Sequence, residues 1–537
     1  MALGRAARLL LSATLLAPSL GAPGEGQCAA GDAACSAAPG AGAARQHPWP
    51  NARGPIGSYG VSRYRAPRNL SASLAWNLTD GRGRGGIVLN GGLVIDDKLN
   101  IYTAATNGLH KVSPDGRLLW SRHGGFSGAP VLDGDTLYGD SKDGMVYALD
   151  LETGTPRWEK KVTDAIGPDC HSVGVSEGVV ITNVDGKEGG GASTVIALNT
   201  STGETIWTFK PDSQLWNIMP MFTGNGSVLF QDQVGRGYHL DLFTGKSIWR
   251  NGVQASFTEF WTDGMSWLGP NGLFYVVHVH GVMGQLAPTT PSDLRAYRVS
   301  DGEFVWRKDF PYPINSQPVV AQLREGESPS LVMNSGLQAG IPLRAAFFFS
   351  GMAGLFLGVP LALLLLFLNV LCRRCESPRR RTMRRCCLFP VLLSLLMMGL
   401  GGASALRMFH NKFPSEVQVL DAATGELRWR YEFPVWNSFN VRGDDELFFP
   451  RIFRQVQPFC IPNGWGSPSV DASGTVWLGH QNGHIYGLRD EDGDGRISES
   501  EVVATFDMGA SSTQFGGAYA PGMLAWASCD TVFVFKE

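Results

Sequence analysis

The sequence predicts an all-β protein: an eight-bladed β-propeller interrupted by a two-helix transmembrane hairpin. Three observations predict this fold. A Gly followed four residues later by a Trp recurs six times, and two uncharged apolar runs stand close together late in the chain. The chain is also long enough to bury a large core, since 44% of its 537 residues are hydrophobic and 68 are glycines that suit many turns. A seven-bladed ring is the alternative, because the last repeat is incomplete.

Each repeat is predicted to be a strand, a tight turn and a second strand. In residues 147–158 alternating apolar residues favour a strand, and the Gly after Thr153 provides the positive φ that the turn needs. Another strand pair precedes most repeats, so that one unit has about four strands. A Trp is large enough to fill the space between two stacked blades. We therefore expect seven blade-packing residues: Trp76, Trp120, Trp158, Trp207, Trp249, Trp306 and Trp429.

The repeat resembles the pyrroloquinoline-quinone (PQQ) repeat, whose mark is A-x-D-x-x-T-G-x-x-x-W. A full match is given by Ala148, Asp150, Thr153, Gly154 and Trp158, and a close match by Asp421, Thr424, Gly425 and Trp429. The resemblance covers roughly residues 70–340 and 413–537. It implies a β-propeller like that of the quinoprotein alcohol dehydrogenases. Enzymes of that family hold PQQ on the propeller axis between a Trp and a disulfide of adjacent cysteines, with a calcium ion and an Asp base.

The blades are expected to follow one another along the chain. Six end at the tryptophans from Trp120 to Trp429, and a seventh covers residues 467–506 with Phe506 at the Trp position. Residues 518–536 supply only part of a blade, and residues 70–78 have the pattern of its missing outer strand. Joining the two parts in one blade would close the ring and remove open sheet edges.

The N-terminal residues 1–22 are typical of a secretory signal peptide, because Arg5 and Arg8 precede an apolar run that ends in small residues. The Ala- and Gly-rich residues 23–47 are expected to be disordered. An exported chain would offer four glycosylation candidates: Asn69, Asn77, Asn199 and Asn225. Five of its cysteines would lie in an oxidising compartment: Cys28, Cys35, Cys170, Cys460 and Cys529.

Two apolar segments, residues 343–371 and 387–407, predict a membrane hairpin. Each contains an uncharged run long enough to cross a hydrocarbon core of about 30 Å. The loop between them, residues 372–386, carries seven arginines and is therefore predicted to be cytosolic. Membrane lipid would then be a partner of the chain. The alternative is a pair of buried helices in a soluble protein.

Two crossings return the chain to the side from which it came. Residues 48–342 and 408–537 would therefore form one propeller, lumenal or extracellular, on a membrane of the secretory pathway. The hairpin falls between the two strand pairs of blade six, which would hold the propeller close to the lipid. The net charge of −3 divides unevenly, since the arginine-rich loop leaves about −9 for the rest of the chain. An acidic exported part argues against nucleic acid as a partner.

The cytosolic loop and its borders contain four palmitoylation candidates: Cys372, Cys375, Cys386 and Cys387. The neighbouring arginines should favour anionic lipid. A metal site with four thiolates is an alternative for these cysteines, although the second pair is adjacent rather than spaced by two residues.

Residues 490–501 match the twelve-residue calcium loop of an EF-hand. Carboxylates stand at positions 1, 3 and 5, a Gly at position 6 permits the sharp turn, and position 12 is a Glu. The expected calcium ligands are Asp490, Asp492, Asp494, the carbonyl of Arg496, Ser498 through a water, and Glu501. The flanking residues are predicted strands of blade seven rather than EF-hand helices, so the ion would clamp the blade. The alternative is an acidic, solvated turn.

Calcium is the expected cofactor, and PQQ is not. The adjacent cysteines Cys386 and Cys387 are predicted to be cytosolic, and the calcium loop lies in a blade turn rather than on the axis. We therefore expect a non-enzymatic protein-binding scaffold or sensor, with a PQQ-dependent dehydrogenase as the alternative. A deep polar pocket on the axis would favour the enzyme, whereas a filled axis with an apolar rim would favour the scaffold.

Four histidines are candidates for other sites. His278 and His280 alternate on one predicted strand and share a face, where a satisfied polar pair is expected rather than a metal site or a base. His480 and His484 flank an Asn-Gly turn and are expected to face solvent. The sequence therefore predicts no catalytic residue.

Overall fold

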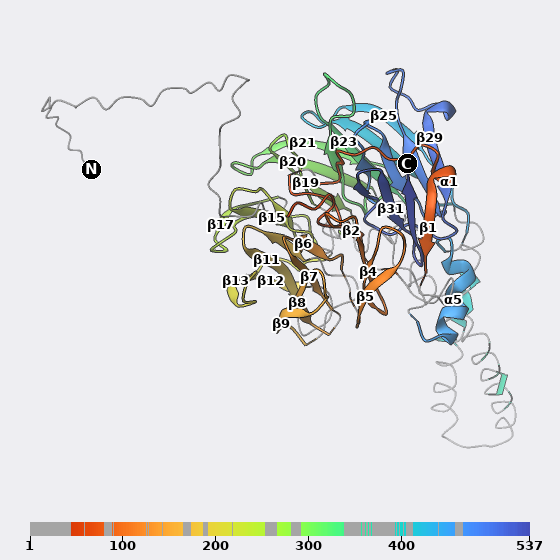
Figure 1. Cartoon of the computed structure of the whole chain (residues 1–537). Helices are drawn as coiled ribbons and strands as arrows, with labels where there is room; N and C mark the ends of the chain where they lie inside the picture. Colours follow the sequence, from red (N-terminus) through yellow and green to blue (C-terminus); the bar gives the residue numbers. More distant parts are fainter. Residues whose placement is uncertain are drawn as a thin grey trace, which may run out of the picture. The chain divides into compact units, whose positions relative to one another are not determined.

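The structure, a computed structural model, describes residues 45–337 and 412–537 with short gaps, together with scattered positions between 356 and 403. The gaps are 58, 80–88, 90, 125, 127, 142, 165–172, 186–191, 217, 253–261, 263–265, 281–290, 439 and 457–465. The described residues form eight four-stranded antiparallel sheets (Figure 1). The predicted all-β, eight-bladed propeller is confirmed, and the seven-bladed alternative is wrong.

The first four blades each use four strands in chain order, hydrogen-bonded one to the next. Blades one and two consist of β2 (Val94–Ile95), β3 (Ile101–Ala105), β4 (Gly108–Val112) and β5 (Leu118–His123), and of β6 (Val131–Asp133), β7 (Thr136–Asp140), β8 (Met145–Asp150) and β9 (Pro156–Lys161). Blades three and four consist of β10 (Gly174–Ser176), β11 (Val179–Asp185), β12 (Ala192–Asn199) and β13 (Thr205–Phe209), and of β14 (Met221–Phe222), β15 (Ser227–Gln231), β16 (Gly237–Asp241) and β17 (Ser247–Asn251).

Blades five to seven continue this order, and blade eight departs from it. Blades five and six consist of β18 (Trp267–Leu268), β19 (Leu273–Val279), β20 (Ser292–Arg298) and β21 (Phe304–Phe310), and of β22 (Val319–Ala321), β23 (Ser330–Gly336), β24 (Ser415–Asp421) and β25 (Leu427–Glu432). Blades seven and eight consist of β26 (Ser469–Val470), β27 (Val476–Gly479), β28 (His484–Leu488) and β29 (Val502–Asp507), and of β30 (Ala518–Ala520), β31 (Met523–Ala527), β32 (Val532–Lys536) and β1 (Leu74–Leu78).

Blade eight joins the two ends of the described chain, as the sequence predicted. Its outer strand β1 pairs with β32, with Trp76 opposite Val534. Its inner strand β30 contacts β2 of blade one, which closes the ring. Strands from the two ends of the described chain are therefore hydrogen-bonded in one sheet. This pairing removes an open strand edge at which two molecules could aggregate.

The antiparallel strands give the ring two distinct faces. In every blade the turn between the second and third strands lies at one face, called here the 2–3 face. The turn between the third and fourth strands lies at the opposite face, called here the 3–4 face. The chain leaves blade six after β23 and returns at β24, so both ends of the predicted hairpin lie at the 2–3 face.

Tryptophans join most neighbouring blades by one repeated contact. The indole of one blade lies against the turn glycine of the next, in the pairs Trp76/Gly116, Trp120/Gly154, Trp158/Gly203, Trp207/Gly245, Trp249/Gly302 and Trp306/Gly425. In each pair the indole nitrogen donates to a backbone carbonyl of the same turn, for example from Trp207 to Leu242 at 2.8 Å. All six glycines have positive φ, +71° at Gly154, so a side chain there would be strained as well as crowded. Trp429 instead belongs to a buried cluster against which Ile497 and Val502 of blade seven pack.

Blade seven differs from the prediction at the Trp position. The register places Ala504 opposite Gly487, as Trp158 stands opposite Ala148 in blade two. Phe506 lies two residues further along the same strand, opposite Ile485. Its ring packs against Phe533 and Phe535 of blade eight at 5.5 and 4.9 Å. The assignment of Phe506 to the Trp position is therefore wrong by two residues, because the longer calcium loop changes the count along the chain.

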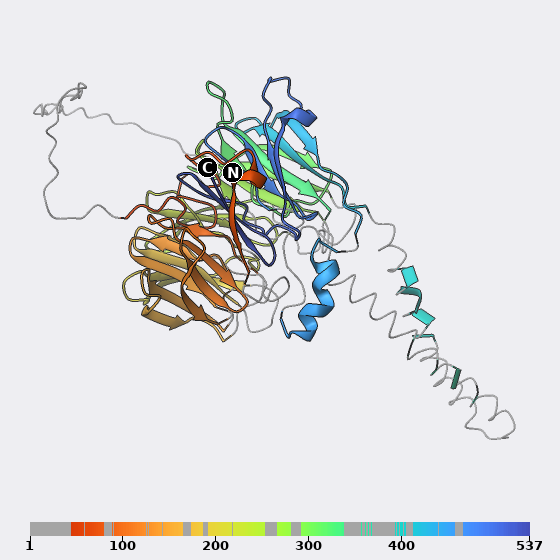
Figure 2. The same cartoon turned by 45° about the vertical axis from the view of Figure 1, so that its right-hand side comes forward.

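Within the described residues 45–337 and 412–537, three short helices accompany the sheets: α1 (Leu70–Ser73), α5 (Asp444–Phe453) and the 3-10 helix η3 (Glu499–Glu501). Figure 2 shows α5 outside the blades, at the edge of the sheets. Within the described part of the chain, no helix combines the length and the apolar character needed to span a membrane. The predicted hairpin (343–371 and 387–407), its loop 372–386, and the signal peptide 1–22 fall almost wholly outside the described residues.

Candidate calcium site and closed propeller axis

The chain's own residues 47–66, called here the axial segment, cover the innermost strands. Backbone hydrogen bonds tie it to blades one, two and seven, between Trp49 and Ile95, Pro50 and Leu132, and Ser62 and Val470. Other contacts reach blades four, five, six and eight, from Tyr59 to Phe222 and Trp267, from Gly60 to Val319, and from Trp49 to Tyr519. Seven of the eight blades therefore contact the segment.

Arg53 is the centre of the axial segment and is completely buried. Its guanidinium donates to three backbone carbonyls, those of Phe515 at 2.9 Å, Pro468 at 2.5 Å and Ser467 at 3.4 Å. It also lies 5.0 Å from the ring centre of Trp267, which adds a cation–π attraction. Burial lowers the pKa of Arg53 to about 9, so the group remains charged at neutral pH. The axis between blades five, seven and eight thus holds a built-in cation.

One cavity of about 610 Å³ lies beside the axial segment at blades two and three. Its lining includes Arg45, His47, Asp133 and Glu177, and contains neither a Trp nor a Cys. Arg45 is already paired with Asp97 at 2.6 Å and with Asp135 at 2.8 Å. The residues that the quinoprotein resemblance implies around a quinone are therefore not assembled in this cavity.

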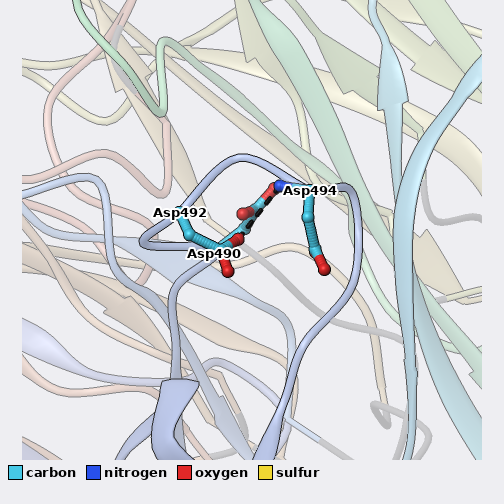
Figure 3. A group of neighbouring side chains, drawn as sticks. All are labelled: Asp490, Asp492 and Asp494. Carbon is cyan, nitrogen blue, oxygen red and sulfur yellow. Dashed lines mark hydrogen bonds between the residues drawn. The ribbon is translucent and has the colours of Figure 1, made fainter.

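The predicted calcium loop connects β28 to β29 at the 3–4 face of blade seven. The side-chain oxygens of Asp490, Asp492 and Asp494 lie within 4.8 Å of one another (Figure 3). Hard carboxylate oxygens at this spacing suit calcium, which takes six to eight oxygen ligands. Three of the predicted ligands are thus brought together.

The loop winds tightly around these carboxylates. Asp490 accepts the N–H of Gly493 at 2.7 Å, and Asp492 accepts that of Asp494 at 3.0 Å, the bond dashed in Figure 3. Asp494 in turn accepts the N–H of the next residue but one at 2.8 Å. Gly495 has φ of +79°, which a residue with a side chain rarely adopts, so the glycine predicted for position 6 is needed by the turn.

Glu501 and Ser498 lie outside the group of three aspartates. One carboxylate oxygen of Glu501 accepts the N–H of Glu491 at 2.7 Å, and the other accepts both the N–H and the hydroxyl of Ser498 at 2.8 Å. The hydrogen bonds from Ser498 and the loop backbone hold the pKa of Glu501 at about 2. Glu501 therefore closes the loop as an anion, and Arg496 is exposed.

Two arginines at the loop gave no signal in the sequence. Arg324, in the turn after β22 of blade six, lies 3.1 Å from a carboxylate oxygen of Asp490 and also donates to the carbonyl of Asp490. Arg68 lies 3.0 Å from Glu491. Their partners are 166 and 423 residues away along the chain, so local sequence patterns could not reveal them. Arg324 offers a positive charge where a calcium ion would sit.

The histidines predicted to share a face both contact Asp293 of the next strand. Asp293 and His278 are fully buried, and the distances are 3.4 Å from His278 and 2.8 Å from His280. Arg295 adds a third partner at 2.7 Å. Burial lowers the pKa of His278, which keeps that imidazole neutral. The group is a polar cluster inside blade five, in which Asp293 is shared by the two histidines and Arg295.

The prediction that His480 faces solvent is wrong. His480 is only 1% exposed, and its ring stacks on Phe433 at 5.1 Å. One ring nitrogen contacts the hydroxyl of Ser415 at 2.8 Å, and the other accepts the N–H of Asn482 at 3.2 Å. Burial lowers the pKa of His480 to about 4. His484 is partly buried. The Asn-Gly turn is covered because Arg442 donates to the carbonyls of Gln481 and Asn482 and packs beside Gly483.

The remaining predicted sites lie at the surface or outside the described residues. Asn69, Asn77 and Asn225 are exposed, and Asn199 is half-buried with its side chain accepting backbone N–H groups of its own turn. Cys529 is disulfide-bonded, and its partner lies outside the described residues. The palmitoylation candidates Cys372, Cys375, Cys386 and Cys387 also lie outside them.

Comparison with known proteins supports the PQQ-repeat propeller. The family model described as outer membrane protein assembly factor BamB matches residues 73–160, 104–263 and 191–283. BamB of Xanthomonas campestris pv. campestris is 36% identical over 95 residues, which are 18% of this chain and 21% of that protein. BamB of Burkholderia pseudomallei is 26% identical over 241 residues, which are 37% of this chain and 58% of that protein. The chain thus spans less than two thirds of the length of these curated relatives.

Solved structures show the same fold at low identity. BamB from Moraxella catarrhalis has a TM-score of 0.50 at 14% identity, covering 86% of this chain and 99% of that one. The quinohemoprotein alcohol dehydrogenase from Comamonas testosteroni also has a TM-score of 0.50, at 13% identity, covering 92% of this chain and 81% of that one. The fold alone therefore does not distinguish a scaffold from an enzyme, and a proposal about function has to rest on the residues of the site.

Proposed function

We propose that this protein is a membrane-anchored, calcium-binding β-propeller that acts as a non-enzymatic protein-binding scaffold or sensor on the lumenal or extracellular side of a secretory-pathway membrane. The filled axis carries the proposal. Where the quinoproteins hold their cofactor, this chain has its own axial segment and the buried guanidinium of Arg53. A second cation and a flat aromatic cofactor at this position would have to displace the axial segment, which packs against seven blades.

The rim of the propeller offers apolar surface for a protein partner. Large apolar side chains on or next to the outer strands of blades one and three to six are at least 39% exposed: Leu118, Leu119, Ile206, Phe243, Ile248, Phe304, Val305 and Leu427. These side chains are distributed over the outer strands of five blades, and the proposal assigns the protein partner to this rim. The relatives named outer membrane protein assembly factor fit a scaffold of this kind.

Two features support export. The disulfide at Cys529 is a bond that persists in oxidising compartments. Three of the four candidate sequons carry exposed asparagines on the propeller, where a glycan would be accommodated. Export of the propeller agrees with a signal peptide at residues 1–22 and a cytosolic loop at residues 372–386.

Exposed apolar side chains in the inserted segment support membrane anchoring. Its described positions include nine large apolar residues that are at least 42% exposed: Phe356, Leu363, Leu364, Phe367, Leu392, Leu393, Leu395, Leu396 and Leu400. Apolar surface of this kind is unfavourable in water and favourable in lipid. Palmitate on the four juxtamembrane cysteines would add to the anchoring.

Calcium has a structural role in this proposal. The three gathered aspartates repel one another, and a bound ion would remove that repulsion and fix the loop between β28 and β29. A lone loop without a paired second loop is expected to bind calcium with Kd on the order of 10⁻⁴–10⁻³ M, as in extracellular modules.

The test compares the two functions on one sample of the full-length protein, purified from membranes in mild detergent. PQQ is titrated in the presence of calcium, with quinone fluorescence and alcohol-dependent dye reduction as readouts, and the same sample is cross-linked to identify bound proteins by mass spectrometry. The proposal expects no quinone binding, no dye reduction and a protein present in amounts comparable to the propeller. Quinone binding with dye reduction would overturn it in favour of the dehydrogenase.

A further inference from the structure

Helix α5 presents an apolar face to the outside of the protein. Phe449, Ile452 and Phe453 occupy positions i, i+3 and i+4, so they lie on one side of the helix. Their exposed fractions are 58, 44 and 82%. Phe453 is the most exposed large apolar residue in the described part of the chain. Exposed apolar side chains of this kind are unfavourable in water and favourable in lipid.

The opposite side of α5 is fixed to the propeller by charge. Arg451 is completely buried and donates to Asp444, which is also buried, at the start of the same helix. The guanidinium of Arg451 is also 3.9 Å from Asp530 of blade eight. The helix is therefore held in one orientation, and its apolar face cannot turn inward without breaking this buried network.

The residues leading to α5 pack on both ends of the inserted segment. Phe413 and Trp436 form a β-bridge, with hydrogen bonds of 2.8 and 3.3 Å in the two directions. Leu337, Phe413 and Val441 belong to one buried cluster. Leu337 is the last described residue before the insertion, and Phe413 stands beside the return to β24. The helix is thus anchored at the 2–3 face, where the chain leaves and re-enters blade six.

Charges of both signs stand near the apolar face. Lys412 is exposed at the return from the insertion, and Arg454 is exposed directly after the apolar face. The helix itself begins with three acidic residues, Asp444, Asp445 and Glu446. The apolar face and its position beside the insertion, rather than the net charge, therefore favour the interfacial layer of a membrane.

We propose that α5 lies on the lipid surface, with Phe449, Ile452 and Phe453 inserted among the acyl chains at the 2–3 face. This inference rests on the proposed membrane attachment through residues 343–407. It sets the orientation of the propeller: the 2–3 face is against the membrane, and the calcium loop at the 3–4 face points away from it. The acidic loop is then open to the solvent of the exported compartment and far from anionic lipid headgroups.

The test uses a photoreactive phenylalanine in the full-length protein, reconstituted in phosphatidylcholine vesicles that contain phosphatidylserine. Phe453→p-benzoylphenylalanine places the probe on α5. Phe243→p-benzoylphenylalanine is the matched control, because Phe243 is 48% exposed in the turn between β16 and β17 at the 3–4 face. After illumination, we expect a mass shift of one phospholipid at position 453 and none at position 243.

Carbonate extraction of the same vesicles separates this inference from the proposed anchoring. Lipid adducts at position 453 support the inference whether or not the protein resists extraction. A protein that resists extraction but gives no lipid adduct at 453, or gives an adduct with another protein there, keeps its anchor and overturns the placement of α5. A protein that gives no lipid adduct at position 453 and is also removed by carbonate overturns both the placement of α5 and the proposed membrane anchoring. Equal lipid adducts at positions 453 and 243 overturn the orientation.

Discussion

The axis and the rim of this propeller carry opposite charges: the axis holds a buried cation, and the rim of blade seven holds a group of mostly exposed carboxylates. On the axis, Arg53 is a permanent cation buried against three carbonyl oxygens and an indole ring. At the rim of blade seven, three aspartates gather with mostly exposed side chains, and Arg324 approaches the first of them. The axis is therefore complete without a ligand, whereas the rim loop is an anionic group that an external cation would complete. In the enzymes that the repeat resembles, the ion belongs to the axis, and the proposed function rests on this contrast.

The largest effect is expected from opening the axis. Arg53→Ala should lower the free energy of unfolding by about 3–5 kcal/mol, because it leaves three buried carbonyls unpaired and a cavity between blades five, seven and eight. Urea unfolding followed by tryptophan fluorescence measures this change. Arg63→Ala, an exposed arginine of the same segment, serves as the control and should change stability by less than about 0.5 kcal/mol. Equal effects of the two substitutions would mean that Arg53 does not hold the axis.

A pH effect is expected from the buried imidazole of His480 in blade seven. The unfolded chain binds a proton at this residue near pH 6.5, whereas the folded protein does so only near pH 4. Stability should therefore fall by about 3 kcal/mol as the pH decreases from 6.5 to 4, and level off below that. Unfolding free energies of wild type and His480→Gln across this range measure the effect, with His484→Gln as the control. An unchanged slope in His480→Gln would contradict the assignment.

Calcium should stabilise the rim loop and leave the axis unaffected. A free calcium concentration about a hundred times Kd should add about 2.7 kcal/mol to the free energy of unfolding. Asp494→Asn should lose this increment while keeping the stability of the calcium-free protein. The check is urea unfolding with calcium and with chelator. The same increment in Asp494→Asn would place the ion elsewhere.

The smallest effect is expected on calcium affinity, from removal of Arg324, which competes with calcium for Asp490. Arg324→Ala should bind calcium roughly fivefold more tightly, since a partly exposed ion pair at Asp490 worth about 1 kcal/mol no longer has to be broken. Calorimetric titration gives the two values of Kd. Arg68→Ala is the matched control, because its partner Glu491 is not a predicted ligand. Weaker binding in Arg324→Ala would show that the arginine supports the site rather than competing for it.

The sequence predicted the features that depend on neighbouring residues. The Gly and Trp of each repeat are four residues apart, and the contact they make is repeated from blade to blade. The three aspartates of the calcium loop lie within five positions, so their approach follows from one tight turn. The outer strand of blade eight was also foreseen, because its pattern completes an unfinished repeat.

The sequence did not reveal features that depend on distant partners. Arg53 stands in an irregular segment, and its carbonyl partners are 414 to 462 residues away. The burial of His480 depends on Ser415 and Phe433 of the preceding blade. Phe506 was assigned two positions from the Trp register, because loop length and strand register cannot be separated without the partner strand.

The central claim is that the ion site of this propeller is at the rim and not on the axis. The most direct measurement is calorimetric titration of calcium into the full-length wild type and Asp492→Asn. The account predicts heat from one bound calcium ion in the wild type and no heat in Asp492→Asn, with both proteins equally folded. Undiminished calcium binding in Asp492→Asn would contradict the claim, because the ion would then bind away from the rim loop.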